Sequence, residues 1–217
     1  MKTKLPFHLI ILLSLLVAAS PARAGAPASA NFTSDSLSTP ITTITRISVD
    51  SNGVQGNKWS DSPSTSADGR YVAFRSIASN WVSGDTDLSF DIFLRDTHTG
   101  ITTLVSVDSS GVKMTSDSSN PSISSDGRYV AFNNGYYWDV FLRDTQMGTT
   151  ALVSQDSSGT EGYGNSGYPS ISADGRYVAF WSDANNLVSG DKYYNDIFLR
   201  DTLLGTTACV SVDSSGT

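Results

Sequence analysis

Acidic residues in two related segments have the spacing of a calcium-binding loop. Calcium takes about six to eight oxygen ligands, and alternating carboxylates that close on a later acid can supply them. Leu88 stands where a strong calcium loop carries glycine, so solvated turn acids are the alternative interpretation. Calcium is therefore the one candidate cofactor, with possible ligands Asp85, Asp87 and Asp91 in the first segment and Asp191, Asn195 and Asp196 in the second.

The same segments hold aromatic residues among Asn, Asp and Gly. Partly exposed aromatic rings can stack on sugars or anchor a peptide, whereas buried ones fill gaps in a core. In "GYYWD" at 135–139, three aromatic residues follow one another and cannot all point inward. We therefore expect a protein or a glycan as partner, with Trp81, Tyr136, Tyr137, Trp138, Tyr193 and Tyr194 as candidate ligand-binding residues.

Catalytic patterns are missing from the sequence. It has no G-x-S-x-G elbow, no H-E-x-x-H and no phosphate-binding loop. The single cysteine, Cys209, can form no internal disulfide, and its place in the repeat predicts a small core residue. We therefore expect no catalytic residue and no enzyme activity.

These candidate residues lie between blocks that recur three times. "SADGRYVAF" at 66–74 returns almost unchanged at 124–132 and 172–180, and "D-I/V-F-L-R-D" follows at 91–96, 139–144 and 196–201. A third block begins with "TT" at 102, 149 and 206, and it has an additional early copy at 42–50. Repeats at intervals of about 40–50 residues are typical of propeller blades. Full units are expected at about 63–108, 121–156 and 169–213, with an isolated strand at 42–50.

Each unit predicts four short strands in sequence order. Aromatic and β-branched residues dominate the blocks, and an Asp-Gly pair at 68–69, 126–127 and 174–175 predicts a type I′ hairpin turn with positive φ at both residues. The segments "YVAF" and "IFL" are apolar on both sides of the alternation, which indicates strands covered on both faces. We therefore expect an all-β chain, a β-propeller of four-stranded antiparallel blades. A β-sandwich with duplicated hairpins is the alternative.

The repeated blocks resemble a known family. "P-S-I-S-A-D-G-R-Y-V-A-F", followed by "D-I-F-L-R-D" and "T-T-x-x-V-S", is similar to the WD-like propeller repeat of the TolB family, across residues 63–213. The chain departs from that pattern at Thr65, Ile123 and Ile171, where the family often has tryptophan. The resemblance implies a protein-interaction scaffold of the cell envelope.

The N-terminus has the order of a secretory signal peptide. Basic Lys2 and Lys4 precede an apolar run at 5–19, and small residues at Ala22 and Ala24 suit cleavage after residue 24. The run is short for a membrane anchor, which needs about 20 residues. We therefore expect a signal peptide at 1–24, a flexible lead-in at 25–40 and propeller repeats at 41–217. The mature chain would be exported to the periplasm or the extracellular space, without membrane insertion.

The charge excludes some partners. Removing Lys2, Lys4 and Arg23 from the 14 basic residues leaves 11 against 21 acidic ones, a net charge of −10. Such a chain is a poor partner for nucleic acid or an anionic membrane.

Closed propellers have about four to eight blades, whereas this sequence supplies three and one additional strand. We therefore expect a piece of a longer protein, or else self-association of two chains into one ring. The connections after the second and fourth strands differ among the copies, and variable loops on a rigid scaffold are where ligands usually bind. The sequence predicts an exported, non-catalytic binding scaffold. The alternative is the accessory propeller of a secreted hydrolase or peptidase whose catalytic domain lies elsewhere.

Overall fold

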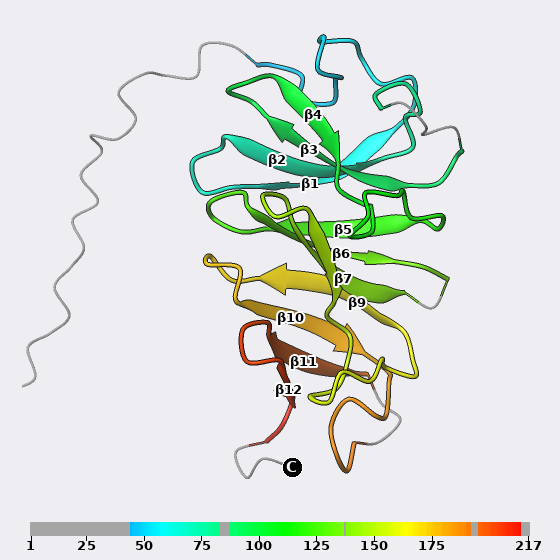
Figure 1. Cartoon of the computed structure of the whole chain (residues 1–217), viewed down its shortest axis with the longest axis vertical. Helices are drawn as coiled ribbons and strands as arrows, with labels where there is room; N and C mark the ends of the chain where they lie inside the picture. Colours follow the sequence, from blue (N-terminus) through cyan, green and yellow to red (C-terminus); the bar gives the residue numbers. More distant parts are fainter. Residues whose placement is uncertain (1–43, 83–86, 137, 192–194, 214–217) are drawn as a thin grey trace, which may run out of the picture. The chain divides into compact units, whose positions relative to one another are not determined.

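A computed structural model describes residues 44–82, 87–136, 138–191 and 195–213 of the chain (Figure 1). These residues form twelve short β-strands and contain no helix. Blade 1 comprises β1 (Ser60–Thr65), β2 (Tyr71–Ser76), β3 (Asp91–Asp96) and β4 (Ile101–Leu104). Blade 2 comprises β5 (Ser118–Ile123), β6 (Tyr129–Asn134), β7 (Asp139–Asp144) and β8 (Thr149–Leu152). Blade 3 comprises β9 (Ser166–Ile171), β10 (Tyr177–Ser182), β11 (Asp196–Asp201) and β12 (Thr206–Cys209).

Every blade is an antiparallel meander in which the strands pair in chain order. The first strands of successive blades lie side by side, because the Ile123 amide donates to Ser64 Oγ at 3.2 Å and the Ile171 amide donates to Ser122 Oγ at 3.1 Å. The three sheets follow one another face to face in Figure 1. Four-stranded blades that meet along their first strands are the arrangement of a β-propeller, so the predicted fold is confirmed. The ring is open over the described residues.

Apolar side chains on both faces of each blade form the core. Ala73, Ile92 and Leu94 of blade 1 pack with Val130 and Phe132 of blade 2. The equivalent residues of blade 2 pack with Val178 and Phe180 of blade 3. The "YVAF" and "FL" segments of blade 2 are covered on both faces because this blade lies between blades 1 and 3, as the sequence predicted.

The turn between the first two strands differs from the predicted type I′ hairpin. Gly69 has φ 72°, but Asp68 is absent from the positive-φ residues of the described chain. Its carboxylate instead accepts from Ser66 Oγ at 2.6 Å and from the Arg70 amide at 3.0 Å. Five residues therefore link β1 to β2, and the aspartate stabilises the link with its side chain rather than by adopting a left-handed backbone.

The arginine of the third strand connects neighbouring blades. Arg95 Nη1 donates to the carbonyl oxygens of Asp50 and Gly100 and to Thr102 Oγ1, all within 3.0 Å. Arg143 makes the same set of bonds one blade later, and Arg200 repeats the bonds to the preceding segment and to the threonine, at Asp156 and Thr207. The repeated arginine is structural.

The isolated strand expected at 42–50 does not form over residues 44–50, where Val49 makes only a single bridge to Gln55. A fourth strand needs a third strand beside it, and the described residues provide none for this copy. The segment nevertheless lies in its repeat position, because Thr102 Oγ1 donates to the Val49 carbonyl as Thr150 Oγ1 does to that of Val107.

The expected signal peptide at 1–24 and lead-in at 25–40 lie outside the described residues. In the part of the chain that the structure describes, no helix is long and apolar enough to cross a membrane.

Candidate functional site

A strained bulge recurs in the first strand of every blade. The residue before the repeated proline has positive φ in each copy: 51° at Ser62, 53° at Asn120 and 50° at Tyr168. The strands begin three residues before these prolines, earlier than the sequence predicted, and the pairing register shifts at the bulge. A positive φ at a residue other than glycine costs on the order of 1–3 kcal/mol. Bulges of this kind redirect a side chain, often beside a functional site.

The three bulges lie near the start of the first strands, at one end of the blades. That end carries the connections after the second and fourth strands, and we call it the loop face. The opposite end, with the connections after the first and third strands, is the turn face. The bulge residues and their partners on the second strands lie near the loop face, where the variable loops led us to expect ligand binding. Together with Trp138, from the connection between β6 and β7, they form what we call the bulge strip: Asp61, Ser62, Arg75, Ser119, Asn120, Asn133, Trp138, Gly167, Tyr168 and Trp181.

In blade 1 the strip holds an ion pair. Arg75 Nε and Nη2 each donate to the Asp61 carboxylate at 2.7 Å. The guanidinium also lies over the Phe90 ring, 4.1 Å from its centroid, and reaches Ser119 of blade 2 at 3.2 Å. Hydrogen bonding to Arg75 lowers the pKa of Asp61. The two charges therefore compensate each other.

In blade 2 the strip holds amides. Asn120 Nδ2 donates to Asn133 Oδ1 at 2.9 Å, and Asn133 is buried. Asn133 pairs across the strands with Ser119, as Arg75 pairs with Asp61 in blade 1. The same position thus changes from a charged to a neutral polar pair.

In blade 3 the strip is aromatic. Tyr168 is 63% exposed, and its ring centroid lies 6.4 Å from that of Trp181. Gly167 stands where the other blades have Asp61 and Ser119, and its φ is not positive. A Cβ here would lie 3.3 Å from Trp181 Nε1 and 3.8 Å from Cε3 of Trp138, a blade 2 residue. The glycine therefore makes room for two indoles, and we call Trp138, Tyr168 and Trp181 around Gly167 the aromatic niche.

The predicted ligand-binding aromatics have different fates. Trp138 lies in the niche, and Tyr136 is 85% exposed on the loop face. Tyr137, Tyr193 and Tyr194 lie outside the described residues. The prediction that Trp81 binds a ligand is wrong, because its side chain is only 8% exposed and packs edge-on against Phe74 and Phe93. Its ring fills the core under the loop.

An ammonium group occupies the place that the calcium hypothesis gave to a metal ion. Lys113 Nζ lies 2.9 Å from Asp87 and 3.1 Å from Asp91. Asp91 also accepts from Ser106 Oγ, and Asp196 accepts from Ser211 Oγ in blade 3. Asp85 lies outside the described residues, Asn195 is exposed and Asp191 is half-buried. Among the side chains that the structure describes, no three His, Cys, Asp or Glu residues form a group that could hold a metal.

Blade 2 has an acid where blade 1 has this lysine. Glu161 bridges to Gln155 as Lys113 does to Val107, and it faces Asp139, the counterpart of Asp91. Both carboxyl groups line a cavity of about 230 Å³ with Tyr163. Burial, together with the charge of Glu161, raises the pKa of Asp139 to about 6.

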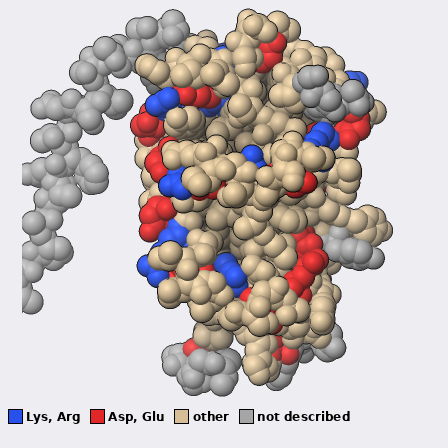
Figure 2. All heavy atoms as spheres, in the orientation of Figure 1, with Lys and Arg blue, Asp and Glu red and all other residues tan. Residues whose placement is uncertain are grey.

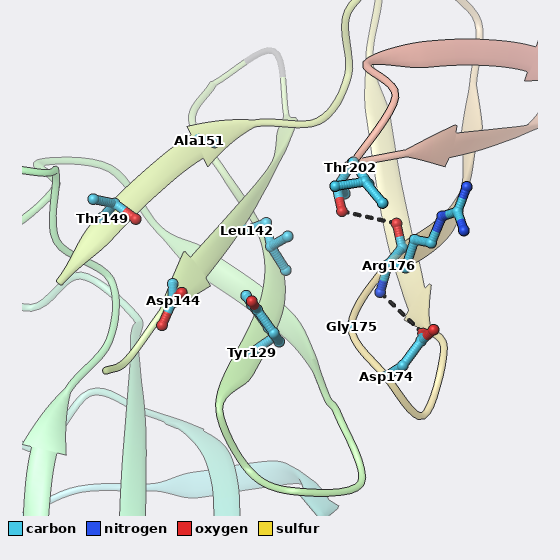
Figure 3. Close-up of a pocket in the computed structure, with 10 residues that line it drawn as sticks. Tyr129, Leu142, Asp144, Thr149, Ala151, Asp174, Gly175, Arg176 and Thr202 are labelled. Atoms are coloured by element: carbon cyan, nitrogen blue, oxygen red, sulfur yellow. Dashed lines mark hydrogen bonds between the residues drawn. The ribbon is translucent and has the colours of Figure 1, made fainter. Parts of the chain in front are cut away.

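The turn face has a larger pocket, about 590 Å³, between blades 2 and 3 (Figure 3). Dashed lines in Figure 3 show that the backbone of Arg176 is bound to Asp174 and Thr202. Its guanidinium pairs with Asp201 at 2.7 Å, and Asp144 on the other wall pairs with Arg128 at 2.7 Å. Figure 2 shows basic and acidic side chains side by side along this edge of the blades. The charged groups of the pocket hold the scaffold together, which makes the bulge strip the better candidate.

Sequence reasoning missed most of the strip. Its signal is the residue before the repeated proline, which is Ser, Asn or Tyr in an otherwise constant block. The partners on the second strand, Arg75, Asn133 and Trp181, also directly follow the constant "YVAF".

A comparison with solved structures finds propellers. The chain is similar to TolB from Acinetobacter baumannii, with 18% identity over 73% of this chain and 36% of that one and a TM-score of 0.47. It is similar to the β-propeller domain of the trilobed protease from Pyrococcus furiosus, with 13% identity over 70% and 42% and a TM-score of 0.49. It is also similar to an acylaminoacyl peptidase from Pyrococcus horikoshii, with 14% identity over 76% and 26% and a TM-score of 0.45.

The chain spans less than half the length of each of these proteins. TolB is among the matches, as the sequence resemblance predicted, while the fold assignment itself rests on the blades described above. No family model matches the sequence, and a search of curated proteins gave no match.

Proposed function

We propose that the chain is an exported, non-catalytic propeller scaffold that binds a protein or a glycan along the bulge strip. The observation that carries this proposal is the recurrence of one strained backbone geometry beneath three different side chains. Ser62, Asn120 and Tyr168 all retain positive φ. Strain of this kind persists where the surrounding structure holds a side chain in a required direction.

The contrast between the strip and its surroundings supports binding. The turns and core segments are nearly identical in all blades, as the nonapeptide at 66–74, 124–132 and 172–180 shows. The strip changes from an ion pair to amides to aromatic rings over the same three blades. A repeated scaffold with divergent side chains at one end has the organisation of a binding surface.

Export rests on the N-terminal sequence, with its basic start, apolar run and small residues before position 25. A fusion of residues 1–24 to a phosphatase that is active only outside the cytoplasm tests it. We expect phosphatase activity from this fusion. A fusion in which Leu12 and Leu13 are replaced by Arg should give none, and equal activity of the two would contradict export.

Retention of cell-envelope material on immobilised protein tests the binding proposal. An extract is separated into protein and polysaccharide fractions, and each is passed over the chain from residue 25. We expect the wild type to retain at least one fraction. The double variant Arg75→Gln/Tyr168→Asn should bind that fraction at least about tenfold more weakly. Met147→Ala, at an exposed residue of the turn face, is the matched control and should retain it fully. Equal retention by the strip variant would overturn the proposal.

A further inference from the structure

The aromatic niche combines three rings from two blades in one place. Tyr168 and Trp181 come from neighbouring strands of blade 3, and Trp138 comes from the turn immediately before β7 in blade 2. Tyr168 and Trp138 are 63% and 40% exposed, although large aromatic residues are usually covered. Trp181 Nε1 and Trp138 Cε3 lie 3.3 Å and 3.8 Å from the Cβ position of Gly167, the one strip position without a side chain.

The backbone fixes the direction of the two exposed rings. Trp138 and Tyr168 both have a φ of 50°, a conformation that L-residues other than glycine adopt at a cost. Tyr168 is followed by the buried Pro169, and Trp138 is followed by Asp139, which pairs with Asn134 where β7 begins to pair with β6. Rings held in this way lose little freedom when a ligand stacks on them.

Polar groups beside the niche suit hydroxyls. Asn133 Oδ1 lies 3.8 Å from the Cβ position of Gly167, and the Asn120 amide is bound to it. An amide both donates and accepts, as a sugar hydroxyl does. Ser119 of the same blade adds a hydroxyl that already accepts from Arg75.

The charged side chains around the niche are engaged elsewhere. Arg75 is bound by Asp61, while Asp139 accepts from Ser154 and Asp183 accepts from the Asn165 amide at 2.6 Å. A phosphate or a peptide carboxylate would therefore find no free cation among these groups, because Arg75 is already paired with Asp61. Exposed aromatic faces beside amides, with Arg75 already paired, disfavour an anion and favour a ligand that has one apolar face and hydroxyl groups.

We infer that the aromatic niche is a subsite for one pyranose ring of a neutral oligosaccharide, with the apolar face of the sugar on the rings and its hydroxyls toward Asn120, which the buried Asn133 holds in place. This inference rests on the proposed function of the bulge strip, and it names the ligand class. A peptide is the competing occupant, and the experiment below separates the two.

Blade 2 supplies the substitutions that test the niche, because it accepts other residues in the same backbone geometry. Tyr168→Asn places at position 168 the residue that Asn120 already is at φ 53°. Gly167→Ser introduces the counterpart of Ser119 and a Cβ within 3.3 Å of Trp181 Nε1. Trp59→Ala, which removes an exposed indole from blade 1, is the control. Thermal unfolding checks that all three variants are folded.

The probes are an array of neutral hexose and N-acetylhexosamine oligosaccharides and a library of neutral peptides, with tryptophan fluorescence titration of the oligosaccharides that bind. We expect the wild type to bind at least one oligosaccharide, the two niche variants to lose at least about tenfold in affinity, and Trp59→Ala to bind within about twofold of the wild type. Binding of oligosaccharides that both niche variants retain would overturn the inference, as would wild-type binding to peptides alone.

The outcomes also separate this inference from the function on which it rests. If the protein fraction of the envelope is retained through the strip while no oligosaccharide binds, the sugar subsite is wrong and the binding function stands. If neither the envelope fractions nor the oligosaccharides depend on the strip, both are wrong.

Discussion

At the scale of single residues, one position of the repeat changes the charge balance of a blade. Lys113 bonds to Asp91 in blade 1, whereas Glu161 faces Asp139 in blade 2. In blade 1 the ammonium group of Lys113 therefore balances the charge of Asp91. The arrangement in blade 2 places two carboxyl groups in one cavity, where burial and mutual repulsion favour the protonated form of Asp139.

This acid pair predicts a pH dependence of stability. The pKa of Asp139 is about 6 in the folded chain and 3.8 in its ordinary state, so the folded chain binds more protons between these values. Stability therefore falls as the pH rises from about 4 to about 6. We expect Glu161→Lys, which copies blade 1, to remove this fall and to stabilise the chain by about 1 kcal/mol at pH 7, after allowance for solvent screening. Urea unfolding from pH 4 to 8 measures it.

Glu161→Gln is the control for that experiment, because it removes the repulsion without adding a cation. Its pH profile should lie between those of the wild type and Glu161→Lys. Superimposable profiles of all three proteins would show that the two carboxyl groups do not interact.

At the scale of elements, the repeated Asp-Gly turn has a second role that depends on its neighbour. Gly127 of blade 2 lies against the Tyr71 ring of blade 1, where a Cβ would overlap that ring. Arg70 covers the same ring, with its guanidinium carbon 4.8 Å from the centroid. Gly69 occupies the same turn position in blade 1, with nothing within 4 Å of its Cβ position. The two glycines share a φ near 70° but differ in contact.

The pair predicts two different costs for one substitution. Gly69→Ala should destabilise the chain by about 1–2 kcal/mol, the cost of a left-handed L-residue. Gly127→Ala should cost about 1–3 kcal/mol more, because the methyl group must displace Tyr71. Denaturant unfolding measures both variants. Tyr71→Ala in the Gly127→Ala background should recover no more than the steric part, and equal costs at the two glycines would contradict blade stacking through this contact.

The elements could be predicted where local chemistry decides them. Repeated "YVAF" and "IFL" segments predicted the second and third strands and their burial on both faces, because apolar residues at successive positions of a strand point to opposite faces. The first strands were predicted too short, because a bulge before Pro63, Pro121 and Pro169 lets pairing continue past a residue of positive φ. Residues 44–50 have the sequence pattern of the fourth strand but form no strand, because a strand also needs a neighbouring strand to pair with.

The candidate site was only partly predictable for the same reason. Trp138 stood out as part of an aromatic cluster, but its place beside Gly167 depends on how blade 2 stacks on blade 3. Trp81 had the same loop composition and lies in the core, because Phe74 and Phe93 form a surface beneath it. Asp87 and Asp91 had the spacing of metal ligands, and a lysine distant in sequence pairs with both. Contacts between distant segments decided each outcome.

At the scale of the whole propeller unit, the two outer blades present unequal faces. The outer face of blade 1 is partly covered, since Ile47 packs near Val72 and Phe74. The outer face of blade 3 is open: Ile92 and Val140 are 0% exposed, while their counterpart Ile197 is 43% exposed. Leu199 and Tyr177 lie on the same open face. A blade that covered it would bury the same apolar set as the two existing interfaces.

Exposed apolar surface of this kind predicts association of the chain with itself. Burying a large apolar side chain contributes about 1.5–3 kcal/mol, and an ionised carboxylate at the same place opposes burial. We expect the chain from residue 25 to form dimers or larger species as its concentration rises, and Ile197→Asp to weaken this association at least about tenfold. Sedimentation velocity over a hundredfold concentration range measures it.

Leu203→Asp is the control, because Leu203 is exposed on the same blade but on the turn face. It should associate like the wild type. A wild-type monomer at every concentration would contradict association, and equal weakening by both variants would contradict the open face as its site.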